Sequence, residues 1–258
     1  MRGLIIKDFY CLKKQIITFC VTLLAVVILS IMFVLSSRYG NIATGYQEMI
    51  AEGEMSATNI PTISKYVVLI FMLIPIACTE DITSIFEDDR NASFAKLAYS
   101  FPISIKKRVA CRFISGIFFI GIGVITDIVL TFVLASLTDY ISVQHFCGGI
   151  ITFASIMLIF ISFIIFVMYL SGGKKINVSN YVVAVVIVFF VQFFVYTRTK
   201  VDFGADEAVM SKQLTIFYMG IVDTIFDKSY VFAIVAMMIA TASYFGSVAV
   251  AKRKRGVA

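Results

Sequence analysis

The sequence has little charge for its length: 15% of its 258 residues are charged, whereas 60% are hydrophobic. An ordinary soluble domain carries about 25% charged residues. A chain with this composition has more apolar surface than one soluble core can bury. The shortage of charge therefore excludes an ordinary soluble protein and predicts an all-α integral membrane protein whose helices contact lipid.

Patterns for metal binding, disulfides and catalysis are also missing. The five cysteines are scattered without a Cys-x-x-Cys pair, and His145 is the only histidine. Zinc sites need clusters of cysteine and histidine ligands. The sequence contains no GxxxxGK[ST] phosphate loop, no HExxH and no GxSxG. We therefore expect no metal site, no cofactor site and no enzyme site, and a chain that cannot hydrolyse ATP by itself.

Six apolar segments are long enough to cross a membrane, since a helix needs about 20 apolar residues to cross a hydrocarbon core of about 30 Å. They are residues 15–36, 62–79, 113–136, 146–170, 180–197 and 229–250. The first segment is longer than the apolar part of a signal peptide and has no cleavage site after it, so we expect it to remain as an anchor. No internal repeat or low-complexity linker divides the chain, which predicts one transmembrane domain over 1–258.

The basic residues predict the orientation of this domain. Lysines and arginines concentrate in the N-terminal segment, in the connections 80–112 and 171–179, and in the C-terminal tail. Cytoplasmic segments next to membrane spans are enriched in these residues, so both termini are predicted to be cytoplasmic. The tail sequence KRKR at 252–255 directly follows a span, which favours an anchor on anionic lipid over a nucleic-acid patch.

The N-terminal segment MRGLIIKDFYCLKKQ predicts an interfacial helix that lies along the inner leaflet. Its apolar residues fall on one broad helical arc: Leu4, Ile5, Phe9 and Leu12. Lys7 lies on the other side of this helix, whereas Asp8 interrupts the apolar arc. A basic leader without regular structure is the alternative.

The connection between the second and third spans, residues 80–112, is polar yet regularly patterned. It contains an apolar set formed by Ile82, Ile85 and Phe86, and a helical stripe formed by Phe94, Leu97, Ala98 and Phe101. Pro102 ends that helix because it lacks a backbone donor, and Ser104 can cap the next one. Three adjacent carboxylates at 87–89 favour contact with a protein over contact with the anionic inner leaflet. A helix that lies on lipid headgroups is the alternative.

Residues 211–229 form a second amphipathic stripe, between the fifth and sixth spans. This stripe predicts a helix on the outer side, which either closes the outer end of a pathway or lies passively at the interface. Ala242 and Gly246 in the last span have the spacing of small residues that allows close helix packing.

Polar residues inside the spans are few, and two of them form a candidate intramembrane site. Asp127 lies near the middle of the third span, and Gln192 lies in the fifth. A charge at this depth is costly unless it faces a partner or water. Asp127 is therefore a candidate for proton relay or substrate contact. An inter-helix hydrogen bond or a protonated buried acid is the alternative.

Three short motifs, together with this topology, resemble the small bacterial permeases of the type-2 ABC exporter class. The motifs are LIIKDF (Leu4–Phe9), SFPIS (Ser100–Ser104), and the basic residues with RF (Arg112–Phe113) that follow it. The family usually has Leu before the proline and Lys-Tyr in place of RF, so these are conservative departures. The resemblance covers nearly the whole chain. Within the class the chain is most similar to permeases that export phenol-soluble modulin peptides, with lantibiotic-immunity permeases as neighbours.

The resemblance implies the membrane subunit of an ATP-driven exporter of amphipathic peptides in the bacterial cell membrane. Such a subunit pairs with a second permease subunit, as a homodimer or heterodimer, and with two cytoplasmic ATP-binding subunits that hold ATP and Mg²⁺. The helix in the 80–112 connection would be the coupling helix that contacts the ATPase. This assigns the coupling role to Glu87, Asp88, Asp89, Arg90, Phe94 and Leu97. The alternatives are an ATP-independent secondary transporter or channel that uses Asp127, a permease of the lantibiotic-immunity type, or a membrane protein that only docks partners.

Overall fold

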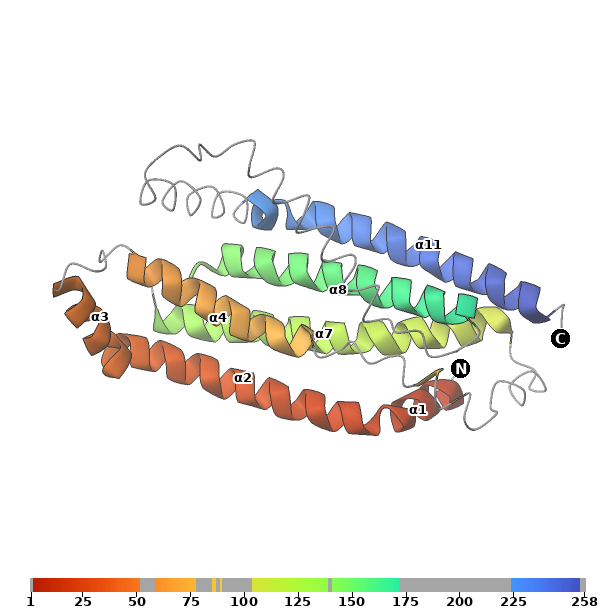
Figure 1. The fold of residues 1–258 in the computed structure, drawn as a ribbon, viewed down its shortest axis with the longest axis horizontal. Coiled ribbons are helices and arrows are strands. Elements are labelled where there is room, and N and C mark those ends of the chain that lie inside the picture. Colours follow the sequence, from red (N-terminus) through yellow and green to blue (C-terminus); the bar gives the residue numbers. More distant parts are fainter. Residues whose placement is uncertain are drawn as a thin grey trace.

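The structure is a computed structural model that describes residues 2–51, 59–77, 85, 86, 89, 104–138, 141–171 and 224–255. Its elements within these ranges are all helices: α1 (Arg2–Cys11), α2 (Lys13–Tyr39), α3 (Asn41–Ala51), α4 (Asn59–Ala77), α7 (Ile105–Leu137), α8 (Val143–Ser171) and α11 (Ser229–Arg255). The long helices lie side by side in an elongated bundle (Figure 1). The prediction of an all-α chain is confirmed for these residues.

Four of the helices, α2, α7, α8 and α11, are long and apolar enough to cross a membrane. α4 carries a shorter apolar stretch, Ser64–Ile76. These five helices contain four of the predicted spans completely and most of the predicted span 62–79. The predicted span 180–197 lies outside the described residues. The helices therefore support a multi-pass membrane protein, and the count of six spans stays a prediction.

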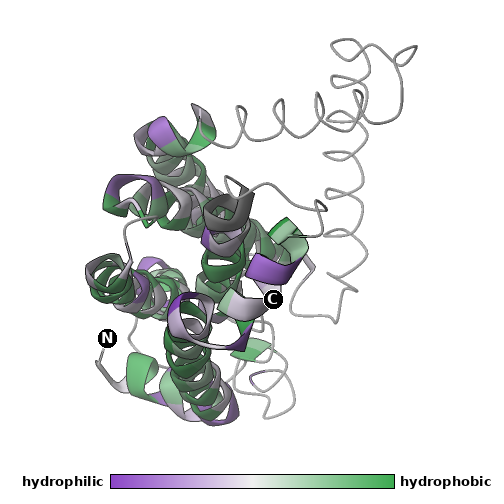
Figure 2. Ribbon diagram, turned by 90° about the vertical axis from the view of Figure 1, so that its left-hand side faces the viewer, coloured by the Kyte–Doolittle hydropathy of each residue, from purple (hydrophilic) through white to green (hydrophobic). Residues whose placement is uncertain are grey.

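The outer surface of the bundle suits contact with lipid. Large apolar side chains are more than half exposed on α2, where Val21 is 60% and Leu24 is 61% exposed, and on α7, where Ile125 is 65% and Val129 is 58% exposed. The ribbons of the long helices in Figure 2 carry mostly hydrophobic colours, with hydrophilic colours mainly near the helix ends that face the viewer. Water would make this surface costly, so hydrocarbon is its expected solvent.

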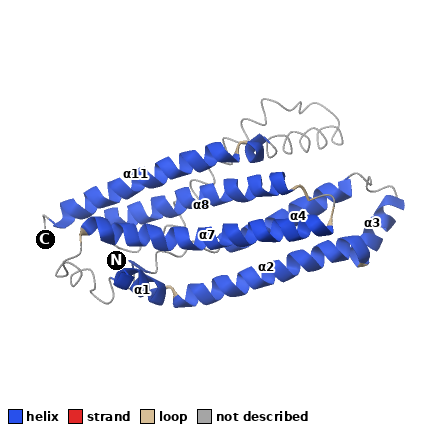
Figure 3. Ribbon diagram, turned by 180° about the vertical axis from the view of Figure 1, so that it is seen from behind, coloured by secondary structure: helices blue, strands red, loops and turns tan. Residues whose placement is uncertain are grey.

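The helices run in two directions, and both ends of the described chain lie at the same end of the bundle (Figures 1 and 3). We call this the termini end. α2 and α7 run away from it, whereas α4, α8 and α11 run toward it. Because the order of the helices brings α1, the start of α7 and the end of α11 to this end, segments far apart in the sequence become neighbours there.

α7 begins where the sequence predicts a helix start. The side chain of Ser104 accepts a hydrogen bond of 3.4 Å from the backbone N–H of Lys107, and α7 then continues for 33 residues. This capping bond satisfies one of the donors that the first turn of a helix leaves free. The predicted restart of the helix at Ser104 is confirmed.

A separate helix, α1, precedes the first span. It ends at Cys11, and Leu12 joins it to α2 with a side chain that is 1% exposed. The backbone N–H of Leu12 still donates to the carbonyl of Asp8 at 3.0 Å. α1 packs against α7, where the rings of Phe9 and Phe118 are 4.9 Å apart. The predicted N-terminal helix is present, and its position along a leaflet stays a prediction.

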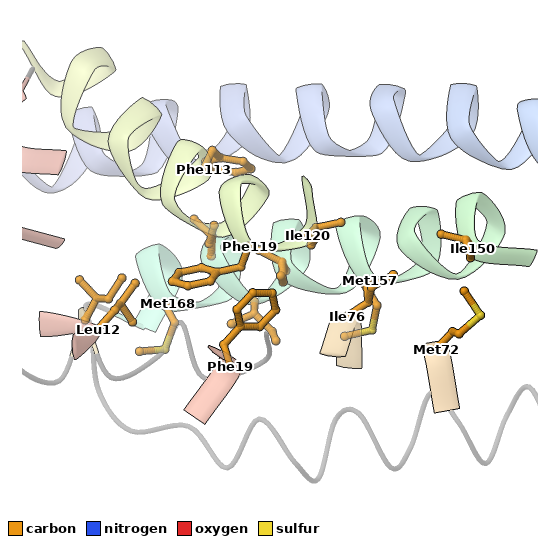
Figure 4. Packing of buried hydrophobic residues seen from close by; sticks show 14 of the residues in the cluster. Leu12, Phe19, Met72, Ile76, Phe113, Phe119, Ile120, Ile150, Met157 and Met168 are labelled. Carbon is orange, nitrogen blue, oxygen red and sulfur yellow. The ribbon is translucent and has the colours of Figure 1, made fainter. Parts of the chain in front are cut away.

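The core of the bundle is a continuous cluster of buried apolar side chains. Ten of its members are labelled in Figure 4: Leu12, Phe19, Met72, Ile76, Phe113, Phe119, Ile120, Ile150, Met157 and Met168. The rings of Phe19 on α2 and Phe119 on α7 are 5.6 Å apart and nearly perpendicular, an arrangement that aromatic pairs favour. This contact aligns the parallel helices α2 and α7.

The small residues of α11 behave differently from each other. A Cβ atom on Gly246 would lie 2.8 Å from Cε2 of Phe166 on α8. The predicted close packing is therefore confirmed for Gly246. Ala242 is exposed, because it lies on the side of α11 that faces away from the bundle, so the small-residue pair does not act as one packing motif within this chain.

Candidate functional site

Four charged residues from three segments meet at the termini end of the bundle. Lys7 and Asp8 come from α1, Asp89 comes from the connection between α4 and α7, and Arg112 comes from the third turn of α7. We call these four residues the ionic cluster. It joins the N-terminal helix, the connection that was predicted to carry the coupling helix, and a membrane span.

Arg112 is the centre of the ionic cluster. Its Nη1 donates a hydrogen bond of 2.6 Å to Oδ1 of Asp8, and its Nη2 donates to Oδ2 of Asp89. The guanidinium carbon also lies 5.2 Å from the ring centroid of Phe86, a distance typical of a cation–π contact. A planar guanidinium has several donors in a fixed geometry, so one side chain can hold both carboxylates and an aromatic ring.

Lys7 completes the cluster from the other side. Its Nζ pairs with Oδ1 of Asp89 and lies 3.6 Å from Oδ1 of Asp8. Two cations and two carboxylates thus give the cluster no net charge. Buried ions need such pairing because removing each one from water costs several kcal/mol. The side chain of Asp8 is 1% exposed and that of Arg112 is 9% exposed.

Asp8 depends on this arrangement more than the other members do. Burial raises the pKa of its carboxyl above the usual 3.8, although Arg112 and Lys7 lower it, because the cost of removing the charge from water is larger. Its Oδ2 is buried and has no hydrogen-bond partner among the described residues. Since the folded state raises this pKa, the stability that protonated Asp8 adds is present at low pH and is lost as the pH rises through the raised value.

The connection between α4 and α7 is also held by apolar contacts. Ile85 is fully buried and Phe86 is 9% exposed, as expected for the apolar set that precedes the acidic residues. The ring of Phe86 meets the ring of Tyr169 on α8 edge to face, with centroids 5.5 Å apart. The beginning of the connection therefore contacts α1, α7 and α8 together.

The structure places one of the six predicted coupling residues, Asp89, in the ionic cluster. Both of its carboxylate oxygens face cations of the same chain. The other five lie outside the described residues: Glu87, Asp88, Arg90, Phe94 and Leu97. Contact of these six residues with an ATPase stays a prediction, and Asp89 has an internal role that the sequence did not indicate.

Of the two predicted intramembrane residues, Gln192 lies outside the described residues and Asp127 lies in the middle of α7. The side chain of Asp127 is 1% exposed, on the helix face opposite to Ile125 and Val129. Its Oδ2 is buried without a hydrogen-bond partner in the described part of the chain. Its backbone carbonyl accepts a hydrogen bond of 2.8 Å from the hydroxyl of Thr131. Asp127 thus faces the bundle interior, and its function stays a prediction.

Lys7, Asp8 and Arg112 were not predicted as site residues. One signal in the sequence indicates them: Asp8 interrupts an otherwise apolar arc of α1. A carboxylate on the apolar face of a helix is costly to bury as an ion unless it is paired and hydrogen-bonded, most directly with a cation. Asp8 therefore marks a place where the helix packs against an oppositely charged partner, which is Arg112.

A double-mutant cycle can measure whether the ionic cluster joins α1 to the α4–α7 connection. Lys7→Met and Asp89→Asn each remove one charge with little change in shape. We expect a coupling energy of about 0.5–3 kcal/mol between them in thermal unfolding of the detergent-solubilised protein, because residues in one ionic network are not additive. The matched cycle of Lys13→Met with Asp89→Asn should give a value near zero, since Lys13 is exposed. Equal coupling energies in the two cycles would contradict the contact between Lys7 and Asp89.

The fold and the cluster define a class of protein: a multi-pass helical membrane protein in which charged residues tie a polar connection to the spans. Residues 49–252 match the family model described as ABC-2 family transporter protein. Because this match covers most of the sequence, the chain belongs to the ABC-2 family of transporter proteins. Comparison with curated proteins and with solved structures gives no significant match.

Membership of this family defines the role of the chain at a coarse level. The chain is a membrane subunit of an ABC transporter, and it associates with an ATP-binding subunit. The predicted resemblance to type-2 ABC permeases is confirmed at the level of the family. The matched region includes Asp89 and Arg112, whereas Lys7 and Asp8 precede it. The closer likeness to modulin peptide exporters stays a prediction.

Proposed function

We propose that the chain is the permease subunit of an ATP-driven exporter that moves amphipathic peptides out of a bacterial cell. It works with a second permease subunit and two cytoplasmic ATP-binding subunits. The observation that carries the proposal is the ionic cluster, because it connects the segment expected to contact the ATPase with α1 and α7, while the neighbouring Phe86 contacts α8. The peptide substrate rests on the resemblance of the chain, within the type-2 ABC exporter class, to permeases that export phenol-soluble modulin peptides.

In this proposal the termini end of the bundle is the cytoplasmic end. Exposed basic side chains collect there, at Lys106 and Lys107 on α7 and at Lys252 and Arg253 on α11. Basic residues next to spans favour the cytoplasmic side. The ATP-binding subunits therefore approach the end of the bundle at which the ionic cluster lies.

The ionic cluster supplies a physical route for coupling. An ATPase that closes on ATP moves the segment 87–101 that it contacts. Phe86, directly before this segment, and Asp89, near its beginning, are held by Arg112 and Lys7, so the displacement reaches α7 and α1 through short contacts. Packed side chains and ionic networks of this kind transmit motion between rigid helices. Rearrangement of these helices changes the side of the membrane to which the substrate path opens.

The family also bears on the alternative functions. Membership of the ABC-2 family favours ATP-driven transport over an ATP-independent secondary transporter or channel that uses Asp127. Membership of this family also favours a transport function over the alternative of a membrane protein that only docks partners. Asp127 is then available for another role within an ATP-driven cycle.

The proposal is tested by reversing the charge of the predicted docking segment. In the variant with Glu87→Arg and Asp88→Arg, we expect insertion and yield to stay normal. ATP-dependent uptake of an amphipathic peptide into inverted membrane vesicles should fall at least about tenfold, because like charges across an interface cost several kcal/mol. The measurement is peptide uptake per ATP hydrolysed, in vesicles that contain the chain and its ATPase.

Asp227→Arg is the matched control, because Asp227 is an exposed acid at the end of the bundle opposite to the termini end. It should leave uptake per ATP unchanged. Wild-type coupling in the variant with Glu87→Arg and Asp88→Arg would show that this segment does not dock the ATPase. Absence of ATP-dependent uptake by the wild-type complex would overturn the peptide substrate.

A further inference from the structure

Asp127 is the only carboxylate in the five described helices α2, α4, α7, α8 and α11. The lysines and arginines of these helices lie toward their ends. On α7, Arg112 is fifteen residues away from Asp127, which corresponds to about 22 Å along a helix. In the described part of the bundle, the chain therefore places an acidic group at mid-depth without placing a basic side chain beside it on the same helix.

The environment of Asp127 does not compensate its charge. The side chain is 1% exposed, and Oδ2 has no hydrogen-bond partner in the described residues. An ionised carboxylate without a partner in an apolar interior is strongly unfavourable. Such a group lowers stability unless a positively charged or hydrogen-bond-donating group binds it.

Four hydroxyls in the bundle interior are buried and lack hydrogen-bond partners among the described residues: those of Ser30, Ser64, Thr152 and Ser162. Two of them, on Ser30 of α2 and Thr152 of α8, bear on Asp127 because of their depth in the bundle. Other hydroxyls in these spans behave differently: Thr131 and Ser155 donate to the carbonyl one turn earlier, at 2.8 and 2.6 Å. Ser30 and Thr152 therefore keep their oxygen atoms available to a group that is not part of the helix.

These hydroxyls lie at nearly the same depth as Asp127. Three contacts between helices set the relative depths: Phe19 with Phe119, Ile76 with Gly123, and Leu69 with Gly149. Counting residues from these contacts puts Thr152 level with Asp127 and puts Ser30 within about one helical turn of it. The middle of the bundle thus has side-chain oxygen atoms on α2, α7 and α8 within about one helical turn of the same depth.

We propose that Asp127 binds the positively charged group of the transported amphipathic molecule, an ammonium or guanidinium, when the helices around it separate; this inference rests on the proposed function. Oxygen atoms without a nearby cation suit a ligand that brings N–H donors and positive charge. Asp127 faces away from the lipid-exposed side of α7, so a ligand reaches it between helices. The apolar part of the same molecule contacts the surrounding apolar side chains.

This placement gives the substrate a way to bias the conformational equilibrium. In the packed arrangement of the described helices, Oδ2 of Asp127 has no hydrogen-bond partner among the described residues. A cation that pairs with it only in the open bundle adds its binding free energy to the open state alone. A ligand shifts an equilibrium only by its difference in affinity for the two states. Asp127 thus makes a cationic substrate shift the equilibrium toward the open bundle more strongly than a neutral substrate does.

The test compares two peptides that differ only in charge. The probes are an amphipathic helical peptide with several lysines and the same peptide with glutamine at those positions. The permease–ATPase complex is reconstituted in neutral phosphatidylcholine vesicles, so that lipid charge does not concentrate one peptide. The measurement is the peptide concentration that half-maximally stimulates ATP hydrolysis.

We expect the lysine peptide to stimulate the wild-type complex half-maximally at a concentration at least about tenfold lower than the glutamine peptide. The reason is the binding free energy that a charge-assisted hydrogen bond to Asp127 adds. Asp127→Asn should remove this preference, and Asp127→Glu should retain it. Ser115→Ala is the matched control: it is buried on the same helix, and its hydroxyl already bonds to the carbonyl of Cys111 at 3.0 Å. This control should keep the wild-type preference.

A second measurement needs no variant. Carbodiimides modify carboxyl groups within membranes, and mass spectrometry reports modification at Asp127. The lysine peptide should protect Asp127 in the wild-type complex, and the glutamine peptide should not. Equal modification with both peptides, or a wild-type preference in Asp127→Asn, overturns the assignment. If neither peptide stimulates the wild-type complex, the peptide-export proposal fails first, and the cation site fails with it.

Discussion

Arg112→Ala is expected to abolish ATP-coupled transport and to lower the stability of the permease. The substitution leaves Asp8 and Asp89 close together with Lys7 as their remaining cation in the ionic cluster. Removing one partner of a buried ion pair costs about 3–5 kcal/mol, because the other charge stays buried without compensation. It also removes the contact with the ring of Phe86. The measurements are thermal unfolding of the purified permease and peptide uptake per ATP in inverted vesicles.

Two further variants separate charge from geometry at this position. Arg112→Lys keeps the positive charge but replaces a planar fork of donors with a single ammonium. It should recover part of the stability and little of the coupling, because one ammonium cannot hold both carboxylates and the ring in the same way. Lys107→Ala removes an exposed charge from the same helix and should behave like the wild type. If Lys107→Ala and Arg112→Ala have the same effect, the cluster has no special role.

Gly148→Ala is expected to separate the segment before α11 from the start of α8. A Cβ atom on Gly148 would lie 2.5 Å from the carbonyl oxygen of Phe226. Backbone atoms cannot move aside as a flexible side chain does, so the whole turn must shift. The ring of Phe226 packs against His145, with centroids 4.9 Å apart, and this contact would be lost as well. Overpacking of this kind costs about 1–3 kcal/mol, which thermal unfolding of the purified protein measures.

Gly121→Ala on α7 is the control for this prediction. A Cβ atom at Gly121 meets nothing within 4 Å. Alanine forms helices more readily than glycine by about 1 kcal/mol, so this variant should be as stable as the wild type or more stable. A loss of stability in Gly121→Ala equal to that in Gly148→Ala would contradict the close approach of Phe226 to α8.

The parts of the fold that depend on neighbouring residues could be predicted from the sequence. Apolar length is a local property, and it identified α2, α7, α8 and α11 as helices able to cross a membrane. The start of α7 could be predicted because the capping bond joins Ser104 to Lys107, only three residues later. The burial of Asp127 on the interior face of α7 agrees with the cost of exposing a carboxylate to hydrocarbon in the middle of a span.

The ionic cluster could not be predicted in this way, because its members are far apart in the sequence. Asp8 and Arg112 are separated by 104 positions, and Asp89 and Arg112 by 23. Helical periodicity relates residues a few positions apart, so Asp8 appeared only as an interruption of an apolar arc. The same limit applies to Ala242 and Gly246: their spacing suggested one packing motif, but which side of α11 faces α8 depends on the whole bundle.

The separation between Asp8 and its partner also has a consequence for how the protein is made. A ribosome completes α1 and α2 long before it synthesises Arg112, which follows Asp8 by 104 residues. N-terminal segments begin to fold first during synthesis. The side of α2 that finally contacts α7, including Phe19, therefore stays in lipid or against the insertion machinery until α7 arrives. We expect the N-terminal helix to reach its final position only after the third predicted span has entered the membrane. Docking of α1 against α7 is therefore a late step in the biogenesis of the protein.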